Sequence, residues 1–198
     1  MDTAAAHGHL KVVQWIHENR DEGCTTQAMD GAAMNDHLDV VKWLHEHRPE
    51  GCTTDAMDDA ARNGHLEVVK WRHDNRKEGC TTKAMDGAAA NTAENGHLDV
   101  VKWLHEHRQE GCTTDAMDNA ARNGHSEVVK WLHVNREEGC TTKAMDLAAA
   151  KCHLKVVKGL RSNRSERCAF QQVSAPRYSS VHILRISRVP CLPFGVNF

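Results

Sequence analysis

Residues 111–137 read GCTTDAMDNAARNGHSEVVKWLHVNRE, and this string recurs along the chain with small changes. One cysteine marks each copy, and successive marker cysteines lie 28, 28, 32, 28 and 28 residues apart. The marker cysteines are Cys24, Cys52, Cys80, Cys112, Cys140 and Cys168. A fixed period of about 20 to 50 residues indicates a solenoid, in which each unit buries its apolar face only against its neighbours. We therefore expect an array that presents a surface to another molecule.

The repeats divide the chain into an array over residues 1–168 and a tail over residues 169–198. The six units span about residues 1–23, 24–51, 52–79, 80–111, 112–139 and 140–168. The first unit begins in mid-unit, because Met1-Asp2 aligns with the later Met-Asp pairs, so we expect its first helix to lack the opening turn. The tail matches no repeat and holds three of the four prolines. We expect it to be poorly ordered, the alternative being that it caps the last unit.

Composition excludes several kinds of partner. The array carries 22 basic and 27 acidic residues, and Lys and Glu interleave instead of forming the basic stripe typical of a nucleic-acid binder. No run reaches the roughly 18 apolar residues that a membrane span needs, and the opening MDTAAAHGHLKVV is no secretory signal. We expect no nucleic-acid and no membrane partner, and a reducing interior, cytoplasmic or nuclear.

The unit at residues 53–79 shows the expected local structure. Thr53 or Thr54 offers a helix N-cap hydroxyl, and the segment through Arg62 is typical of a short helix with Met and paired Ala on one face. Gly64 suits the left-handed position that ends a helix. A second helix is predicted from about residue 65 to 75, with Leu, Val and Trp as its apolar stripe. Helices of about 10 residues are marginal alone, so stacking must stabilise them.

The string AAxxGHLxVVK at residues 60–70, repeated around Ala120, His125 and Lys130, resembles the ankyrin repeat. The resemblance covers residues 1–168 and implies an all-α, ankyrin-like solenoid of six helix-turn-helix repeats. Two features depart from the family pattern. The TPLH opening is replaced by Asp-Ala-Met-Asp at residues 55–58, and the period is about five residues shorter. We therefore expect truncated fingers between the helical pairs.

Two irregularities give separate predictions. The 32-residue step adds four residues near Ala88 and Ala89, followed one helical turn later by Thr92 and Ala93. This spacing predicts one longer first helix across residues 90–94. Arg72 occupies a position that holds Leu or Ile in the other units. Because a buried unpaired Arg is very costly, we expect its charged end to reach the edge of the convex side.

Eight cysteines and 15 histidines raise the question of a metal or redox site. Equivalent atoms of neighbouring units lie on the order of 10 Å apart, which is too far for a disulfide and for four converging zinc ligands. No CxxC, HExxH, nucleophile elbow or phosphate-binding loop occurs. We expect buried structural cysteines, no catalytic residues, no metal, no cofactor and no small-molecule substrate.

Three further rows recur once per unit. The histidine after each turn, as in His65, begins a helix and is expected to bond backbone or neighbouring-unit groups. The row of His17, His45, His73, His105 and His133 favours half-buried packing, with a pH-responsive seam as the alternative. The tryptophans are expected in the core, the alternative being a platform on which a partner stacks. The aspartate row, as in Asp58, is expected to be structural.

Three positions on the first helix change from unit to unit and stand at i, i+4 and i+7, on one helical face. They hold Gln27, Asp55, Lys83, Asp115 and Lys143 at the first position; Gly31, Asp59, Gly87, Asn119 and Leu147 at the second; and Met34, Arg62, Glu94, Arg122 and Ala150 at the third. We call these residues the variable stripe. The resemblance implies that this helix lines the concave side, so the stripe is the candidate partner-binding site, unless these positions simply drift.

The sequence thus favours a non-enzymatic scaffold that binds a protein partner along the first-helix face. Two alternatives stay open. One is a metal- or redox-responsive protein that uses the Cys and His rows, and the other is a non-functional fragment of a longer array.

Overall fold

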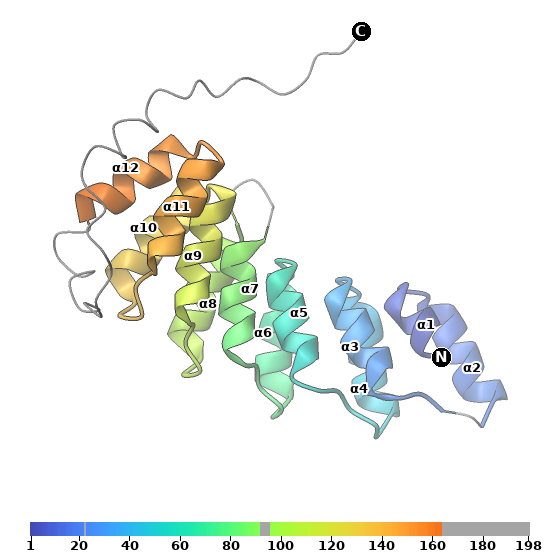
Figure 1. The fold of residues 1–198 in the computed structure, drawn as a ribbon. Coiled ribbons are helices and arrows are strands. Elements are labelled where there is room, and N and C mark those ends of the chain that lie inside the picture. Colours follow the sequence, from blue (N-terminus) through green and yellow to red (C-terminus); the bar gives the residue numbers. More distant parts are fainter. Residues whose placement is uncertain (22, 92–95, 164–198) are drawn as a thin grey trace, which may run out of the picture.

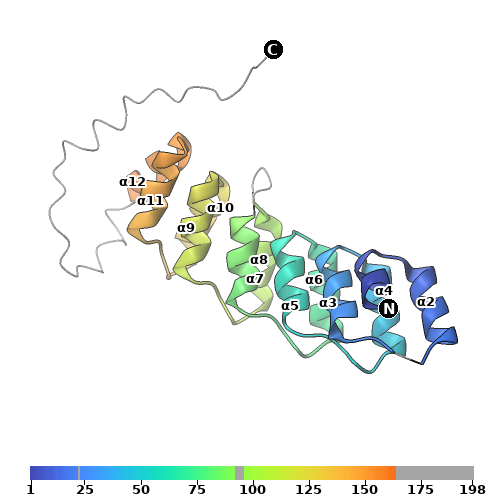
Figure 2. The same cartoon turned by 45° about the vertical axis from the view of Figure 1, so that its right-hand side comes forward.

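The computed structural model describes residues 1–21, 23–91 and 96–163, and within these ranges every regular element is an α-helix. The helices form two layers, with the first helix of each unit in one layer and the second helix in the other (Figures 1 and 2). The first helices are α1 (Asp2–Ala6), α3 (Thr26–Met34), α5 (Asp55–Arg62), α7 (Thr82–Ala90), α9 (Thr114–Asn123) and α11 (Thr142–Ala150). The second helices are α2 (Leu10–Asn19), α4 (Leu38–His47), α6 (Leu66–Asn75), α8 (Leu98–His107), α10 (Ser126–Asn135) and α12 (Leu154–Asn163).

This arrangement confirms the predicted all-α ankyrin-like solenoid. Helix α1, with five residues, is the shortest of the helices in the described ranges. The links that join one unit to the next contain no strand within the described ranges. The tail at 169–198 lies outside the described residues. No helix in the described part of the chain is long and apolar enough to cross a membrane.

The first helices α3, α5, α7, α9 and α11 each begin beside a threonine that also bonds the preceding unit. The Thr81 hydroxyl accepts a hydrogen bond from the Lys83 backbone N–H at 3.1 Å, which caps α7. The same hydroxyl donates to Asp58 Oδ2 at 2.7 Å, and the Thr81 backbone N–H donates to Asp58 Oδ1 at 2.8 Å. The contact recurs five times: Asp2–Thr25, Asp30–Thr53, Asp58–Thr81, Asp86–Thr113 and Asp118–Thr141. The aspartate row is therefore structural, as predicted.

The turn between the two helices of a unit needs a left-handed residue. Gly64 takes this conformation with φ +82°, and a Cβ there would lie 2.3 Å from the His97 ring of the next unit. Glycine thus serves both the backbone and the close approach of that imidazole. In two units a larger residue adopts the same region, Asp36 at φ 63° and Cys152 at φ 59°.

The interior is continuous from unit to unit. The paired alanines of the first helices, such as Ala60 and Ala61, are fully buried. The paired valines of the second helices, such as Val68 and Val69, are buried against them. The small alanines allow the first helices to pack more closely on one another than the second helices do. Closer spacing in one layer makes the array curve toward the first helices.

The prediction of a lengthened helix α7 was wrong for the residues that the structure describes. Helix α7 ends at Ala90, and Asn91 leaves helical geometry with ψ 141°. The Asn91 side chain donates to the Arg62 carbonyl at 2.7 Å, as Asn63 does to the Met34 carbonyl at 2.8 Å. The cause is this inter-unit contact, which ends α7 at the same place as the other first helices. The four extra residues therefore follow Asn91, and 92–95 lie outside the described residues.

Arg72 also departs from its prediction, because its side chain is fully buried and does not reach an edge. Its Nη2 donates to the Thr53 carbonyl at 3.4 Å, whereas Nε and Nη1 are buried with no hydrogen-bond partner among the described residues. The side chain turns inward toward the link that begins its own unit. In the middle of an array, neighbouring units lie on both sides, so this position has no open edge.

We predict that Arg72→Leu stabilises the protein. Leucine already occupies the equivalent buried positions Leu44, Leu104 and Leu132, and replacing a buried charge by a fitting apolar side chain raises the unfolding free energy by about 1–4 kcal/mol. Urea denaturation measures the change. The control is Arg122→Leu, an exposed arginine that takes part in no ion pair among the described residues, and it should shift stability by less than about 0.5 kcal/mol. Unchanged or lower stability in Arg72→Leu would contradict the conclusion that the buried charge of Arg72 destabilises the fold.

A second prediction concerns the contact between aspartate and threonine. Asp118→Ala leaves the Thr141 N–H and hydroxyl without their acceptor and should cost about 2–4 kcal/mol of unfolding free energy. The matched control is Asp146→Ala. Asp146 is the exposed counterpart in the last unit, and the sequence has Ala169 where a threonine would follow. Equal losses in the two variants would show that the inter-unit bonds contribute nothing.

Candidate functional site

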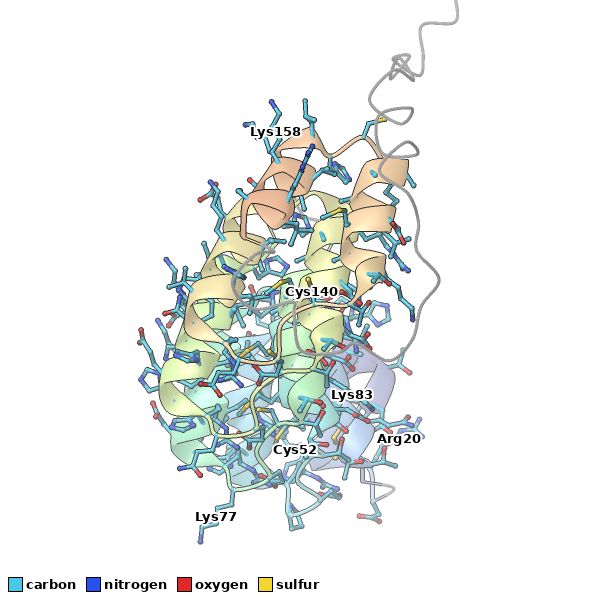
Figure 3. The ribbon with its side chains drawn as sticks, turned by 60° about the vertical axis from the view of Figure 1, so that its left-hand side comes forward. Arg20, Cys52, Lys77, Lys83, Cys140 and Lys158 are labelled. Atoms are coloured by element: carbon cyan, nitrogen blue, oxygen red, sulfur yellow. The ribbon has the colours of Figure 1, made fainter. Side chains whose placement is uncertain are left out.

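The first positions of the variable stripe form an exposed row. Each follows the capping threonines at the start of its helix, and all five side chains are exposed. They are Gln27 on α3, Asp55 on α5, Lys83 on α7, Asp115 on α9 and Lys143 on α11. Figure 3 places Lys83 on the side of the first helices, away from Lys158 on the second helix α12.

The second positions of the variable stripe are half-buried, because they face the preceding first helix. A Cβ on Gly31 would lie 2.9 Å from the Ala6 Cβ, and one on Gly87 would lie 3.0 Å from the Arg62 Cβ. Asp59 instead accepts from Arg62 Nη1 of its own helix at 2.5 Å. The members of this row are Gly31, Asp59, Gly87, Asn119 and Leu147. Packing therefore restricts what these positions can hold.

The third positions are exposed at Met34, Arg62, Arg122 and Ala150. Glu94, the residue expected for unit 4, lies outside the described residues. The structure puts Ala90 in its place, because the Ala90 carbonyl accepts from Asn123 as the Met34 carbonyl accepts from Asn63. Aligning the repeats by sequence alone places the four-residue insertion of unit 4 before Glu94. The inter-unit hydrogen bonds place this insertion after Asn91.

A second inter-unit surface joins the helices of the other layer. The Arg76 Nη1 donates to His45 Nδ1 of the preceding unit at 3.1 Å, and Trp71 meets the same ring edge-on at 5.3 Å between centroids. We call this set of contacts the histidine–arginine seam. It recurs as Arg48–His17, Arg76–His45, Arg108–His73 and Arg136–His105, at 3.1 to 3.3 Å. Because guanidinium only donates, the imidazole Nδ1 is the acceptor in each of these contacts.

The seam includes a carboxylate that sequence reasoning missed. Arg76 pairs with Glu78 two residues later, and the same pairing occurs in three other links. Burial alone would raise the pKa of Glu78, but the hydrogen bonds from the Arg76 side chain and from a backbone N–H, together with the positive charges of Arg76 and Arg72, outweigh it and lower this pKa to about 2. The pair therefore stabilises the fold at neutral pH, and this contribution is lost progressively as the pH falls from about 4.5 to about 2. The signal was the recurring string Arg-x-Glu-Gly-Cys.

Four of the tryptophan side chains are neither fully buried nor fully exposed. Trp43, Trp71, Trp103 and Trp131 are half-buried against the core and lie under a histidine of the preceding unit. The tryptophans were predicted to lie in the core, but their side chains are only partly buried, because each ring packs against a histidine of the seam. Trp15 in the first unit is 56% exposed.

The cysteine row lies inside the array. Cys52, Cys80 and Cys112 are buried, and with Cys24 they are free thiols. Burial raises the pKa of the Cys80 and Cys112 thiols to about 11, so both stay protonated and unreactive at neutral pH. Within the described ranges, no group of three His, Cys, Asp or Glu side chains is arranged to hold a metal ion. The rows therefore offer no cluster for metal chemistry.

Two of the histidines that follow the turns bond the preceding unit, as predicted, whereas the His97 Nε2 is buried with no hydrogen-bond partner among the described residues. The His65 Nε2 donates to the Met34 carbonyl at 3.0 Å, and His125 Nε2 donates to the Asn91 carbonyl. Burial lowers the pKa of His97 and of His125. These rings are neutral structural groups at the interface between units.

The comparison with known families agrees with this geometry. The family model described as "Ankyrin repeats (many copies)" matches residues 1–45, 29–71 and 88–133, which together cover more than half of the chain. The chain belongs to the ankyrin repeat family. A search of curated proteins finds no match. Ankyrin repeats are generally protein–protein interaction modules, and the family is generally non-enzymatic.

The buried histidines predict how the stability of this ankyrin repeat protein depends on pH. Because the pKa of His97 and His125 is lowered in the folded state, the unfolded chain binds these protons more readily. Their contribution is complete above about pH 6.5 and declines as the pH falls. His125→Gln should reduce the drop in the urea midpoint between pH 7.5 and 5.5 by roughly half, since one of the two rings with a lowered pKa is removed. His9→Gln, at an exposed ring, is the control, and an unchanged drop in His125→Gln would refute the prediction.

Proposed function

We propose that this protein is a non-enzymatic scaffold that binds a protein partner along the variable stripe. The observation that carries the proposal is the division of each first helix into two faces. One face holds alanines that are fully buried in every complete unit, such as Ala60 and Ala120. The other holds exposed residues that differ between units, such as Asp55 and Lys83. Exposed positions can change their chemistry without any loss of packing.

The location of the stripe supports the same proposal. The closer packing of the first helices supports placing their exposed positions together on one continuous surface on the inner side of the array. Exposed side chains at these positions are Gln27, Met34, Asp55, Arg62, Lys83, Asp115, Arg122 and Lys143. This mixture of polar, charged and apolar groups suits a protein surface. The half-buried second positions shape its floor and contribute less to recognition.

The test is an affinity capture with matched charge-reversed variants. Asp55→Lys, Lys83→Asp and Asp115→Lys together change the stripe, whereas Glu46→Lys, Lys102→Glu and Glu106→Lys make the same net charge change at exposed positions of α4 and α8. Proteins retained by the wild type are identified by mass spectrometry. We expect a partner whose recovery falls about tenfold or more with the stripe variant and stays unchanged with the control variant. Equal recovery by both variants would refute binding through the stripe.

A further inference from the structure

The charges at the first positions of the variable stripe alternate in sign. Asp55, Lys83, Asp115 and Lys143 stand on four consecutive first helices, and all four side chains are exposed. None of the ion pairs within the described residues involves any of the four. Their charges are therefore available to solvent or to a molecule bound on this surface.

The alternation belongs to a wider two-unit pattern. Units with aspartate at the first position carry arginine at the third, Arg62 and Arg122, and both are exposed. Units with lysine at the first position carry alanine at the third, Ala90 and Ala150. The Arg62 guanidinium is already paired with Asp59, so it leaves Asp55 uncompensated. Along the array, the first positions thus present a regular order of negative, positive, negative and positive charge.

The spacing of these charges selects the conformation of a partner. Neighbouring packed helices lie about 10 Å apart, and seven residues of an α-helix rise about 10.5 Å and return to nearly the same face. An extended chain covers about 10 Å in three residues, but residues i and i+3 point to opposite faces. The insertion after Asn91 does not disturb the row, because α9 packs on α7 with the same asparagine-to-carbonyl bond as elsewhere.

From this match we propose that the surface binds an α-helical segment of a partner protein whose charges alternate in sign every seven residues. Basic side chains of that helix lie opposite Asp55 and Asp115, and acidic side chains lie opposite Lys83 and Lys143. The proposal rests on the proposed function and specifies the chemistry of the partner. Alternation also gives specificity, because a helix with the same composition in another order meets like charges.

Two synthetic helices test the proposal on the full chain. Both are Ala/Gln peptides of about 28 residues with two Lys and two Glu placed seven residues apart. One has the order Lys-Glu-Lys-Glu, and the other has Lys-Lys-Glu-Glu, which pairs at most two of the four charges in any register or direction. By fluorescence anisotropy at low salt, we expect the alternating peptide to bind about tenfold more tightly. The difference should shrink at about 0.5 M salt.

A protein variant reverses the expected preference. Lys83→Asp together with Asp115→Lys keeps the net charge and produces the order negative, negative, positive, positive at exposed positions. This variant should prefer the Lys-Lys-Glu-Glu peptide by about tenfold. Circular dichroism and a thermal melt establish that it folds. The control exchanges charges on the other layer, with Lys102→Glu and Glu106→Lys at exposed positions, and should keep the wild-type preference.

The outcomes separate this proposal from the proposed function. Equal binding of the two peptides by the wild type, no binding of either, or an unchanged preference in the folded variant overturns the alternating-charge helix. If the affinity capture still identifies a partner that needs the stripe, the scaffold function stands and only the chemistry of its partner is revised. If both experiments fail, the stripe is not a binding surface.

Discussion

The carboxylate of Asp58 accepts two hydrogen bonds from Thr81 of the following unit, and the rest of the array depends on contacts of this kind. The same threonine hydroxyl caps helix α7, so one side chain sets both where a helix begins and how it is placed against its neighbour. Helices of eight to ten residues would be marginal alone. Each unit completes its buried face only against the next, which is why the aspartate recurs once per unit.

Because the units depend on one another, the molecule has three kinds of surface, which differ in how freely their residues can change. The buried face must keep small residues, because alanines such as Ala60 and Ala61 allow the first helices to approach closely. The seam must keep its histidines and arginines, because each guanidinium uses the imidazole of the preceding unit as an acceptor. The exposed side of the first helices is released from both demands. The residues of the variable stripe lie there, which is why we propose this side as the surface that recognises a partner.

The two irregular units show what the array tolerates. The four extra residues of unit 4 follow Asn91, where the chain is already leaving the helix, so the bond from Asn91 to Arg62 and the packing of α7 are preserved. Arg72 is a different case, because its position lies between units on both sides and its guanidinium is enclosed. The insertion after Asn91 leaves the described contacts of α7 unchanged, whereas a charge in the shared interior stays enclosed wherever its side chain turns.

The sequence by itself determined the all-α repeat class, the helix bounds of a unit, the left-handed Gly64 and the exposed Asp55, Lys83 and Asp115, because periodicity and capping are local properties repeated six times. It left open the pairing of Arg76 with His45, the constraint on Gly87 from Arg62 and the replacement of Glu94 by Ala90 in the stripe. These features join residues about one unit apart in the chain. Only the stacking geometry decides which of them meet, since no local pattern records the distance between two units.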